Sequence, residues 1–419
     1  MNVVGLITEY NPFHKGHEYH IQKAKELANA DVCVVIMSGN YVQRGTPAFI
    51  DKHTRTKIAL SHGADIVFEL PIPFACSSAE YFASAAVTLL HKLGVVTHIC
   101  FGAEYENIST LSDIADILVS AKLDIHHPLN SLIKEYLKTG ISYATARNNA
   151  LLNITSADNS CILNAPNNIL AIEYLKALKL LNSNINPIAI TRINASYHDS
   201  IGNDTLYSAS SVRAGIISDN KDLYNSLYSF SQEYKTVLNT TGPITEDDFS
   251  SILCDKILTS HSVASNEHNL SDYVGIDDDL ANRIKSRDIM YSFTSYSDLA
   301  QRLKTKNIAY TAISRALLAL TLNIKKSDFT SYIENDIASY IRLLGFNKAH
   351  SHILRDIKKE GELTIIGQLS EISQNTSLSA IDLKMIQHSI YCDELYNMII
   401  RTKYKTDFPN EHIRKLTII

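Results

Sequence analysis

The first half of the chain alternates between segments typical of buried strands and segments with the spacing of amphipathic helices. Short apolar runs of strand length occupy residues 3–8, 31–39, 65–71, 95–102 and 186–193. The stretches between them place apolar residues three and four positions apart, as a helix with one buried face does. Strands that alternate with helices form right-handed βαβ units around a parallel sheet. We therefore predict an α/β fold with a Rossmann-like parallel-sheet domain, whose ligands bind beyond the carboxyl ends of the strands.

The second half, from about residue 220, has helical patterns and no clear series of strands. Residues 242–281 hold nine acidic residues and one lysine, whereas residues 282–359 hold fourteen Lys or Arg and six acidic residues. We predict a parallel-sheet domain at residues 1–219 and an all-helical, locally basic C-terminal domain at residues 220–419. The basic stretch suits nucleic-acid binding, although an ordinary solvated helix bundle would also carry such charges.

The composition restricts the class of protein. The 419 residues are 45% hydrophobic and 20% charged, as in globular proteins, and the apolar runs are shorter than a membrane span. The six cysteines are scattered without a C-x-x-C pair, which favours reduced thiols over disulfides or a zinc site. We expect no signal peptide, no membrane partner and a cytoplasmic location. The formal net charge of −5 excludes a uniformly basic nucleic-acid binder but not a local basic face.

The segment EYNPFHKGHEYH, residues 9–20, joins the first strand to the first helix. Gly16 lets the backbone approach a ligand closely. The helix that follows begins with N–H groups and the positive end of its dipole, which together suit a phosphate. His14 and His17 lie three residues apart around the glycine, so both rings can project into one pocket. There they could stabilise the charge that builds on an α-phosphate as pyrophosphate leaves.

Two other interpretations of the histidine pair remain open. A chain with 16 histidines contains some close pairs by chance, and His17 and His20 would then only occupy a helix surface. Two histidines can also belong to a metal site, but no third ligand has a useful spacing, so we expect no metal held by the protein. The position of the pair, directly after the first strand and at the opening of the first helix, favours the phosphate site.

This segment resembles the H-x-G-H signature of the nucleotidyltransferase superfamily, which is related to the catalytic domain of class I aminoacyl-tRNA synthetases. The wider likeness is to the bacterial tRNA(Met) cytidine acetate ligase family. The motifs that carry it are VVGLITEYNPFHKGHEYH, MSGNYVQRGTPAFIDKHTR, GADIVFELP, CFGAE and PNNILAIEYLKAL, with YTAISRALL and LLGFN in the helical half. The resemblance covers most of the chain.

The resemblance implies an ATP-dependent ligase, with residues 1–219 as the catalytic, ATP-binding domain and residues 220–419 as the tRNA-binding domain. Acetate and ATP would form acetyl-adenylate and pyrophosphate, and the acetyl group would pass to N4 of the wobble cytidine of elongator tRNA(Met), giving N4-acetylcytidine. Mg²⁺ is expected on the phosphates, without protein ligands that can be named. The alternative within the superfamily is a small-molecule adenylyltransferase of the cofactor-precursor type. The non-enzymatic alternative is a nucleotide-sensing RNA-binding protein.

The resemblance also implies the residues of the site, with His14 and His17 as the catalytic pair. The implied ATP-binding residues are Ile7, Thr8, Glu9, Tyr10, Asn11, Pro12, Phe13, His14, Lys15, Gly16, His17, Glu18, Tyr19, His20, Gly102, Asn167 and Arg192. Gly102 could instead be a plain turn, and Arg192 could form a surface ion pair. Asn167 could be only a helix cap, and its neighbour Asn168 could take its place at the nucleotide.

A second phosphate-binding signature is implied downstream of the fifth strand. Its residues are Ser210, Ser211 and Arg213. They would lie at another helix start, although Ser210 as an N-cap alone would explain the pattern. In the segment after the second strand, Gln43, Arg44 and Lys52 are candidates for contacts with acetate or tRNA, and a solvated loop explains each of them equally well.

Overall fold

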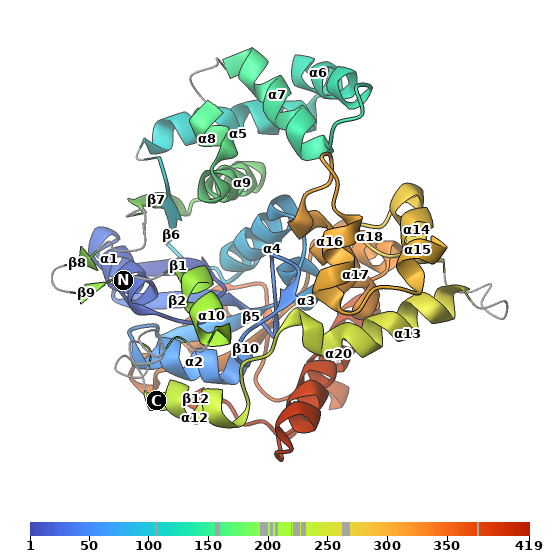
Figure 1. Ribbon diagram of the computed structural model, residues 1–419. Coiled ribbons are helices and arrows are strands. Elements are labelled where there is room, and N and C mark those ends of the chain that lie inside the picture. The colour runs from blue at the N-terminus through green and yellow to red at the C-terminus, as the bar shows by residue number, and fades with distance from the viewer. Residues whose placement is uncertain are drawn as a thin grey trace.

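Eight strands among the described residues form one sheet through the middle of the protein, shown as a computed structural model in Figure 1. The structure describes residues 1–105, 107–155, 160–192, 200–201, 204–205, 208–218, 220, 227, 232–261, 269–374 and 377–419. The order across the sheet is β11-β10-β5-β2-β1-β6-β7, and β12 pairs with β10. The strands are β1 (Val3–Thr8), β2 (Val32–Ser38), β5 (Ile66–Leu70), β6 (His98–Ala103), β7 (Asn186–Thr191), β10 (Tyr340–Phe346), β11 (Thr364–Ile366) and β12 (Thr417–Ile418).

The five strands expected in the first half are present and pair in parallel. Helices alternate with them along the chain, so the Rossmann-like α/β fold is confirmed. β1 lies between β2 and β6, which places its carboxyl end near the middle of one sheet edge. The connecting elements are α1 (Lys15–Leu27), β3 (Tyr41–Val42), β4 (Thr46–Pro47), α2 (Lys52–Ser61), α3 (Ile72–Ala75), α4 (Ala79–Lys92) and α9 (Pro166–Leu180).

Helices cover both faces of the sheet. Apolar residues of α1 and α2 pack on one face, together with residues of α10 (Ala209–Ile217) and α12 (Gln232–Thr240). α4 and α9 pack on the other face, together with residues of α19 (His352–Glu360). Because both faces are covered, a central strand such as β2 is buried along its whole length, which explains its unbroken apolar sequence.

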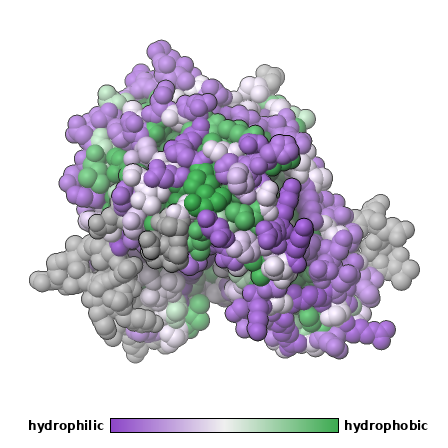
Figure 2. All heavy atoms as spheres, turned by 90° about the horizontal axis from the view of Figure 1, so that it is seen from above, coloured by the Kyte–Doolittle hydropathy of each residue, from purple (hydrophilic) through white to green (hydrophobic). Residues whose placement is uncertain are grey.

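A group of helices stands at one end of the molecule, at the top of Figure 1. It contains α5 (Ile108–Leu123), α6 (Pro128–Leu137), α7 (Tyr143–Thr155) and α8 (Ser160–Asn164). Figure 2 looks down on this end and shows a mostly hydrophilic surface, with apolar residues gathered near its centre. Among the described residues, none of the helices is both long and apolar enough to cross a membrane.

The second half is largely helical, as expected, but it also contributes strands to the sheet. β10 pairs antiparallel with β5, and β11 and β12 pair with β10. The expectation of an all-helical C-terminal region is therefore corrected. β10 is buried or half-buried along its length, so its sequence YIRLLGF lacks the alternation that marks a half-exposed strand. The domain boundary at 219/220 stays a prediction, and residue 219 lies outside the described part.

The helices of the second half surround a core of their own. They are α13 (Ser250–His261), α14 (Asp278–Ile284), α15 (Arg287–Met290), α16 (Tyr296–Leu303), α17 (Tyr310–Thr321), α18 (Lys326–Glu334) and α20 (Ala380–Tyr404). This core includes Tyr41 from β3 and Ile72 from α3, which follow the carboxyl ends of β2 and β5. The helical region therefore packs against the sheet edge at which ligands are expected.

Candidate active site

His14 and His17 lie side by side where β1 leads into α1. Their ring centroids are 3.9 Å apart. His14 is the N-cap of α1, and its Nδ1 accepts the backbone N–H of Gly16 at 3.1 Å. Nδ1 of His17 in turn accepts the backbone N–H of His14 at 3.3 Å. A side chain on Gly16 would lie 2.9 Å from Cε1 of His14, so this close arrangement needs a glycine.

These two hydrogen bonds define the protonation of both rings. A ring nitrogen that accepts an N–H carries no proton, so the neutral forms of His14 and His17 each carry their proton on Nε2. Each ring therefore keeps one N–H donor for a ligand. The two donors lie beside the positive end of the α1 dipole, which also favours an anion.

The surroundings of the pair keep both imidazoles neutral. Burial, with the nearby charges of Arg192 and Arg213, lowers the pKa of His14 to about 4. Burial also holds the pKa of His17 well below its ordinary value, with contributions from His14, His20 and Arg192. The pKa of His20 falls to about 4 for the same reasons, burial first and Arg192 second. A bound anion would thus meet two neutral N–H donors and two guanidinium groups.

Wild type is expected to lose stability relative to His14→Asn as the pH falls below about 6.5. The folded pKa of His14 is about 4 and the unfolded value about 6.5, so the unfolded chain takes up the proton first. The stability linked to neutral His14 is complete above about pH 6.5 and is lost between about 6.5 and 4. Asparagine caps helices without titrating. The unfolding free energies of wild type and variant are measured in urea at pH 7.5 and at pH 5. On going to pH 5, wild type should lose about 1–2 kcal/mol more than the variant. An unchanged difference would contradict a neutral His14.

The predicted ATP-binding segment runs from the end of β1 into α1. Ile7 and Thr8 end β1, Glu9, Tyr10, Asn11, Pro12 and Phe13 form the loop, His14 caps α1, and Lys15, Gly16, His17, Glu18, Tyr19 and His20 begin it. Tyr10 and Phe13 are fully buried, with ring centroids 5.0 and 5.6 Å from that of His17. Oδ1 of Asn11 and Oε1 of Glu9 accept N–H groups from the segment after β2. These four side chains position the loop, and their ATP contacts stay a prediction.

Gly102 and Arg192 lie together at the carboxyl ends of β6 and β7. Gly102 pairs with Ile190 inside the sheet, so it belongs to β6 and the alternative of a plain turn is wrong. A side chain on Gly102 would lie 3.0 Å from Cγ of Arg192, which shows that the arginine lies across the glycine. Arg192 is exposed and forms no ion pair with a described residue, so its guanidinium is available to a phosphate.

The two asparagines at the start of α9 have different surroundings. The N-cap of α9 is Ala165, so neither asparagine is a helix cap. Asn168 is buried, and its Oδ1 accepts the backbone N–H groups of Glu104 and Tyr105 at 2.8 and 3.1 Å. Asn167 is half-buried and donates to Oε1 of Glu104 at 2.5 Å. Asn168 therefore holds the loop after β6, and Asn167 is the side chain that a nucleotide could reach.

Asn168→Ala is expected to lower the unfolding free energy by about 1–3 kcal/mol, because two backbone N–H groups lose their acceptor. Asn168→Asp keeps an acceptor oxygen and should retain most of that stability. Asn167→Ala should change stability by less than about 0.5 kcal/mol and raise KM for ATP. Urea unfolding and the KM for ATP separate these roles. If Asn168→Ala stayed stable but had a raised KM for ATP, Asn168 would be the nucleotide contact and the two roles would be reversed.

The second predicted phosphate signature lies at the start of α10. The N-cap is Ser208, whose Oγ accepts the backbone N–H of Ser211 at 3.1 Å, so the alternative that Ser210 is the cap is wrong. Arg213 donates to the carbonyl oxygen of Asn11 at 2.5 Å. This bond joins α10 to the loop that precedes the histidine pair.

Arg55 is a buried residue of the site that the sequence did not suggest. It is the largest fully buried side chain among the described residues. Its guanidinium donates to the backbone carbonyl oxygens of Glu9 at 2.6 Å, Ser38 at 3.0 Å, and Gly39. These carbonyl groups follow or end β1 and β2, so Arg55 holds the two strand ends together. No pattern in the sequence marked it as buried.

Lys52 is not available to acetate or tRNA, and that expectation is wrong. The residue is fully buried, and its Nζ contacts Glu69 at 2.9 Å, Asp393, and Glu411 at 3.4 Å. Arg342 of β10 contacts the same three carboxylates. We call these five side chains the charge cluster. Burial raises the pKa of Asp393 to about 7, and the other two carboxylates add to the shift. The charge cluster joins α2, β5, β10 and α20.

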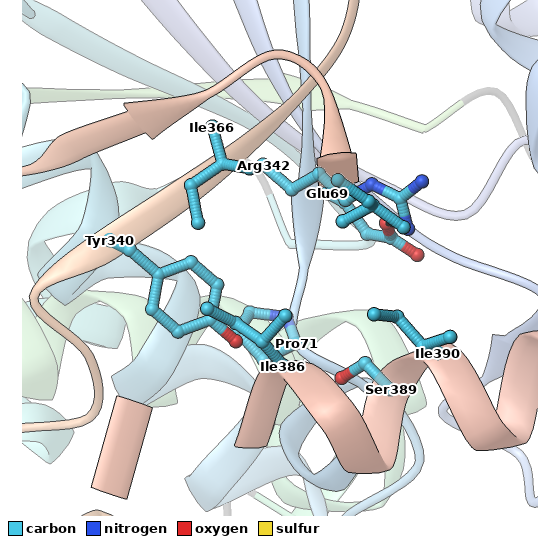
Figure 3. A pocket seen from close by; sticks show the side chains of 9 residues that line it. Glu69, Pro71, Tyr340, Arg342, Ile366, Ile386, Ser389 and Ile390 are labelled. Carbon is cyan, nitrogen blue, oxygen red and sulfur yellow. Dashed lines mark ion pairs between the residues drawn. The ribbon is translucent and has the colours of Figure 1, made fainter. Parts of the chain in front are cut away.

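A small cavity lies beside the charge cluster (Figure 3). Glu69 and Arg342 line one side of it. The other lining residues are Pro71, Tyr340, Ile366, Leu369, Ile386, Ser389 and Ile390. Its volume of about 20 Å³ admits a water molecule and is far too small for a nucleotide. The histidine pair, and not this cavity, is therefore the candidate site for ATP.

The fold and the site together define a nucleotidyltransferase of the H-x-G-H type. The paired imidazoles follow the carboxyl end of the central strand β1, and Arg192 follows the carboxyl end of β7, at the sheet edge where such folds bind nucleotides. The family model described as HIGH Nucleotidyl Transferase matches residues 1–411. Among the described residues, no group of three or more His, Cys, Asp or Glu could hold a metal ion.

The chain belongs to the tRNA(Met) cytidine acetate ligase family. A protein of that name from Acetivibrio thermocellus is 36% identical over 408 residues, 95% of each chain. Another, from Clostridium perfringens, is 38% identical over 413 residues, 92% of this chain and 94% of the relative. Two crystal structures of Thermotoga maritima TmcAL, 28% identical, cover 100% of both chains. The apo form has a TM-score of 0.89, and the form bound with alpha-thio ATP has a TM-score of 0.88.

Proposed function

We propose that this protein uses ATP to activate acetate as acetyl-adenylate and transfers the acetyl group to N4 of the wobble cytidine of elongator tRNA(Met). The product would be N4-acetylcytidine. The observation that carries the proposal is the pair of imidazoles whose Nδ1 atoms are both occupied by backbone N–H groups. The pair supplies two fixed Nε2–H donors at one helix start, within reach of the charges of Arg192 and Arg213, which suits a triphosphate.

In the first step a carboxylate oxygen of acetate attacks the α-phosphorus, and the bond from that phosphorus to the bridging oxygen of pyrophosphate breaks. His14 and His17 would donate to phosphate oxygens, and Arg192 and Arg213 would neutralise the charge that develops on the leaving pyrophosphate. Catalysis by position and charge needs no protein nucleophile. The neutral state of both histidines suits this role, because each remains a donor on Nε2 across the physiological pH range.

In the second step the N4 amine of cytidine attacks the acetyl carbon, AMP leaves, and the amine loses a proton. The basic stretch at residues 282–359 supports binding of the tRNA by the C-terminal region, and such binding should weaken steeply with salt. We also propose that residues 1–219 form the ATP-binding unit. ATP would enter with Mg²⁺ on its phosphates, and the described residues offer no protein ligand set for the ion. A tRNA substrate fits the cytoplasmic location expected from the sequence.

The test is made in two parts with purified protein. ATP–pyrophosphate exchange should depend on acetate, and ATP, labelled acetate and total tRNA should give acetylcytidine at the anticodon of one tRNA. Exchange that depends on a phosphorylated cofactor precursor instead of acetate would show that the protein is a small-molecule adenylyltransferase. Tight ATP binding without turnover for any acid or tRNA would show that it is not a ligase.

A further inference from the structure

The turn of the β3–β4 hairpin, which carries Arg44, packs against Ser314 and Arg315 of α17. Gly45, at the turn of the hairpin, has φ of +81°, and a side chain there would lie 2.3 Å from the backbone nitrogen of Arg315. Oγ of Ser314 donates to the carbonyl oxygen of Gly45 at 2.9 Å, although the two residues are 269 positions apart in the chain. Gly45 is thus needed both for its left-handed backbone and for its contact with the helix.

Both arginines lack a partner among the described residues. Arg44 is exposed and Arg315 half-buried, and neither side chain has a hydrogen bond or ion pair to a described residue. Burial lowers the pKa of Arg315. Holding a half-buried guanidinium without a carboxylate partner costs free energy in the free protein, and a bound anion offsets that cost.

Arg44 is linked to the candidate site through Arg213. The charges of Arg192 and Arg213 help to lower the pKa of His14, and the charge of Arg44 helps to lower the pKa of Arg213. Arg192 and Arg213 suit the triphosphate of ATP, and Arg44 and Arg315 suit a second polyanion.

We propose that Arg44 and Arg315 bind backbone phosphates of the RNA strand that presents the cytidine to the acetyl-adenylate. This inference rests on the proposed function and names the surface by which that substrate is held. The planar guanidinium pairs with phosphate oxygens in a bidentate way. The basic excess of residues 282–359, which include α17, favours RNA over an acidic protein. Phosphate contacts of this kind position the strand without reading its sequence.

The experiment compares Arg44→Gln, Arg315→Gln and the double variant with wild type. tRNA binding is measured directly at several salt concentrations, beside acetate-dependent pyrophosphate exchange and the KM for tRNA. We expect the double variant to bind tRNA at least tenfold more weakly than wild type. The plot of the logarithm of the tRNA association constant against the logarithm of the salt concentration should become less steep by about 0.7–0.9 for each arginine removed. Exchange, which needs no RNA, should persist. Arg315→Lys should restore part of the affinity.

Lys134→Gln, which removes one positive charge elsewhere, provides the control. Lys134 is an exposed residue of α6, outside residues 282–359, and has no ion pair to a described residue. Its loss should leave binding, slope and exchange unchanged. Equal loss of exchange and tRNA binding in the Arg44 and Arg315 variants would place both arginines at the triphosphate and overturn the inference. An unchanged salt slope would also overturn it. Failure of wild type itself to bind or acetylate tRNA would overturn the proposed function.

Discussion

His14→Asn is expected to lower acetate-dependent ATP–pyrophosphate exchange by about 10²–10³-fold while the protein stays folded. Asparagine caps helices well, and its Oδ1 can accept the N–H of Gly16 that Nδ1 now accepts. It has no atom at the position of Nε2, so the variant loses one donor for the charge that develops on the phosphates. Exchange of labelled pyrophosphate measures the rate of adenylate formation, and the midpoint of thermal unfolding shows whether the variant is still folded.

His14→Gln provides the opposite control. Its side-chain amide can reach toward the position of Nε2, but it is a poorer cap, so we expect a loss of about 1 kcal/mol in stability with more exchange retained than in His14→Asn. Together the two variants separate the role of His14 as helix cap from its role as hydrogen-bond donor to phosphate. Wild-type exchange in His14→Asn would mean that His14 is only a helix cap, and the proposed chemistry would be wrong.

Lys52→Met is expected to destabilise the protein by about 3–5 kcal/mol. Lys52 and Arg342 together offset the buried carboxylates of Glu69, Asp393 and Glu411. Methionine matches the lysine in length but leaves three buried carboxylates facing one cation, and breaking a buried pair from one side has this cost. The free energy of unfolding in urea measures the effect. The charge cluster joins α20 to the sheet, so unfolding of the C-terminal helices should accompany the loss.

Lys23→Met is the control for the lysine side chain. Lys23 pairs with Glu26 at 2.8 Å on the surface of α1, where both side chains are solvent-accessible. Exposed pairs contribute little, so this variant should stay within about 0.5 kcal/mol of wild type. If Lys52→Met lost less than about 1 kcal/mol, the charge cluster would not be what holds α20 against the sheet.

The sequence predicted most of the site because its main parts are local. His14, Gly16 and His17 lie within four residues, and their arrangement depends on one strand end and one helix start, both of which follow from periodicity. Gly102 and Arg192 were placed correctly at strand ends, because parallel strands bring their carboxyl ends to one edge. Their roles toward ATP stay predictions.

The errors came from residues whose surroundings are distant in sequence. Lys52 was a candidate for contacts with acetate or tRNA, with a solvated loop as the alternative, and no pattern marked Arg55. Both residues are fully buried. Their partners come from other strands and, for Lys52, from residues more than 300 positions away. β10 was missed because a strand buried on both faces has no alternation to distinguish it from a buried helix.

By itself the sequence determined the βαβ core and the position of the histidine pair. Both depend on local signals, namely the spacing of apolar residues, a glycine and the start of a helix, and each of these spans only a few residues. Only the tertiary structure decided which charges are buried, which tautomer the histidines adopt, and that the hairpin turn at Gly45 packs against α17. The physical reason is that burial and electrostatic partners depend on how distant segments pack, and no local pattern carries that information.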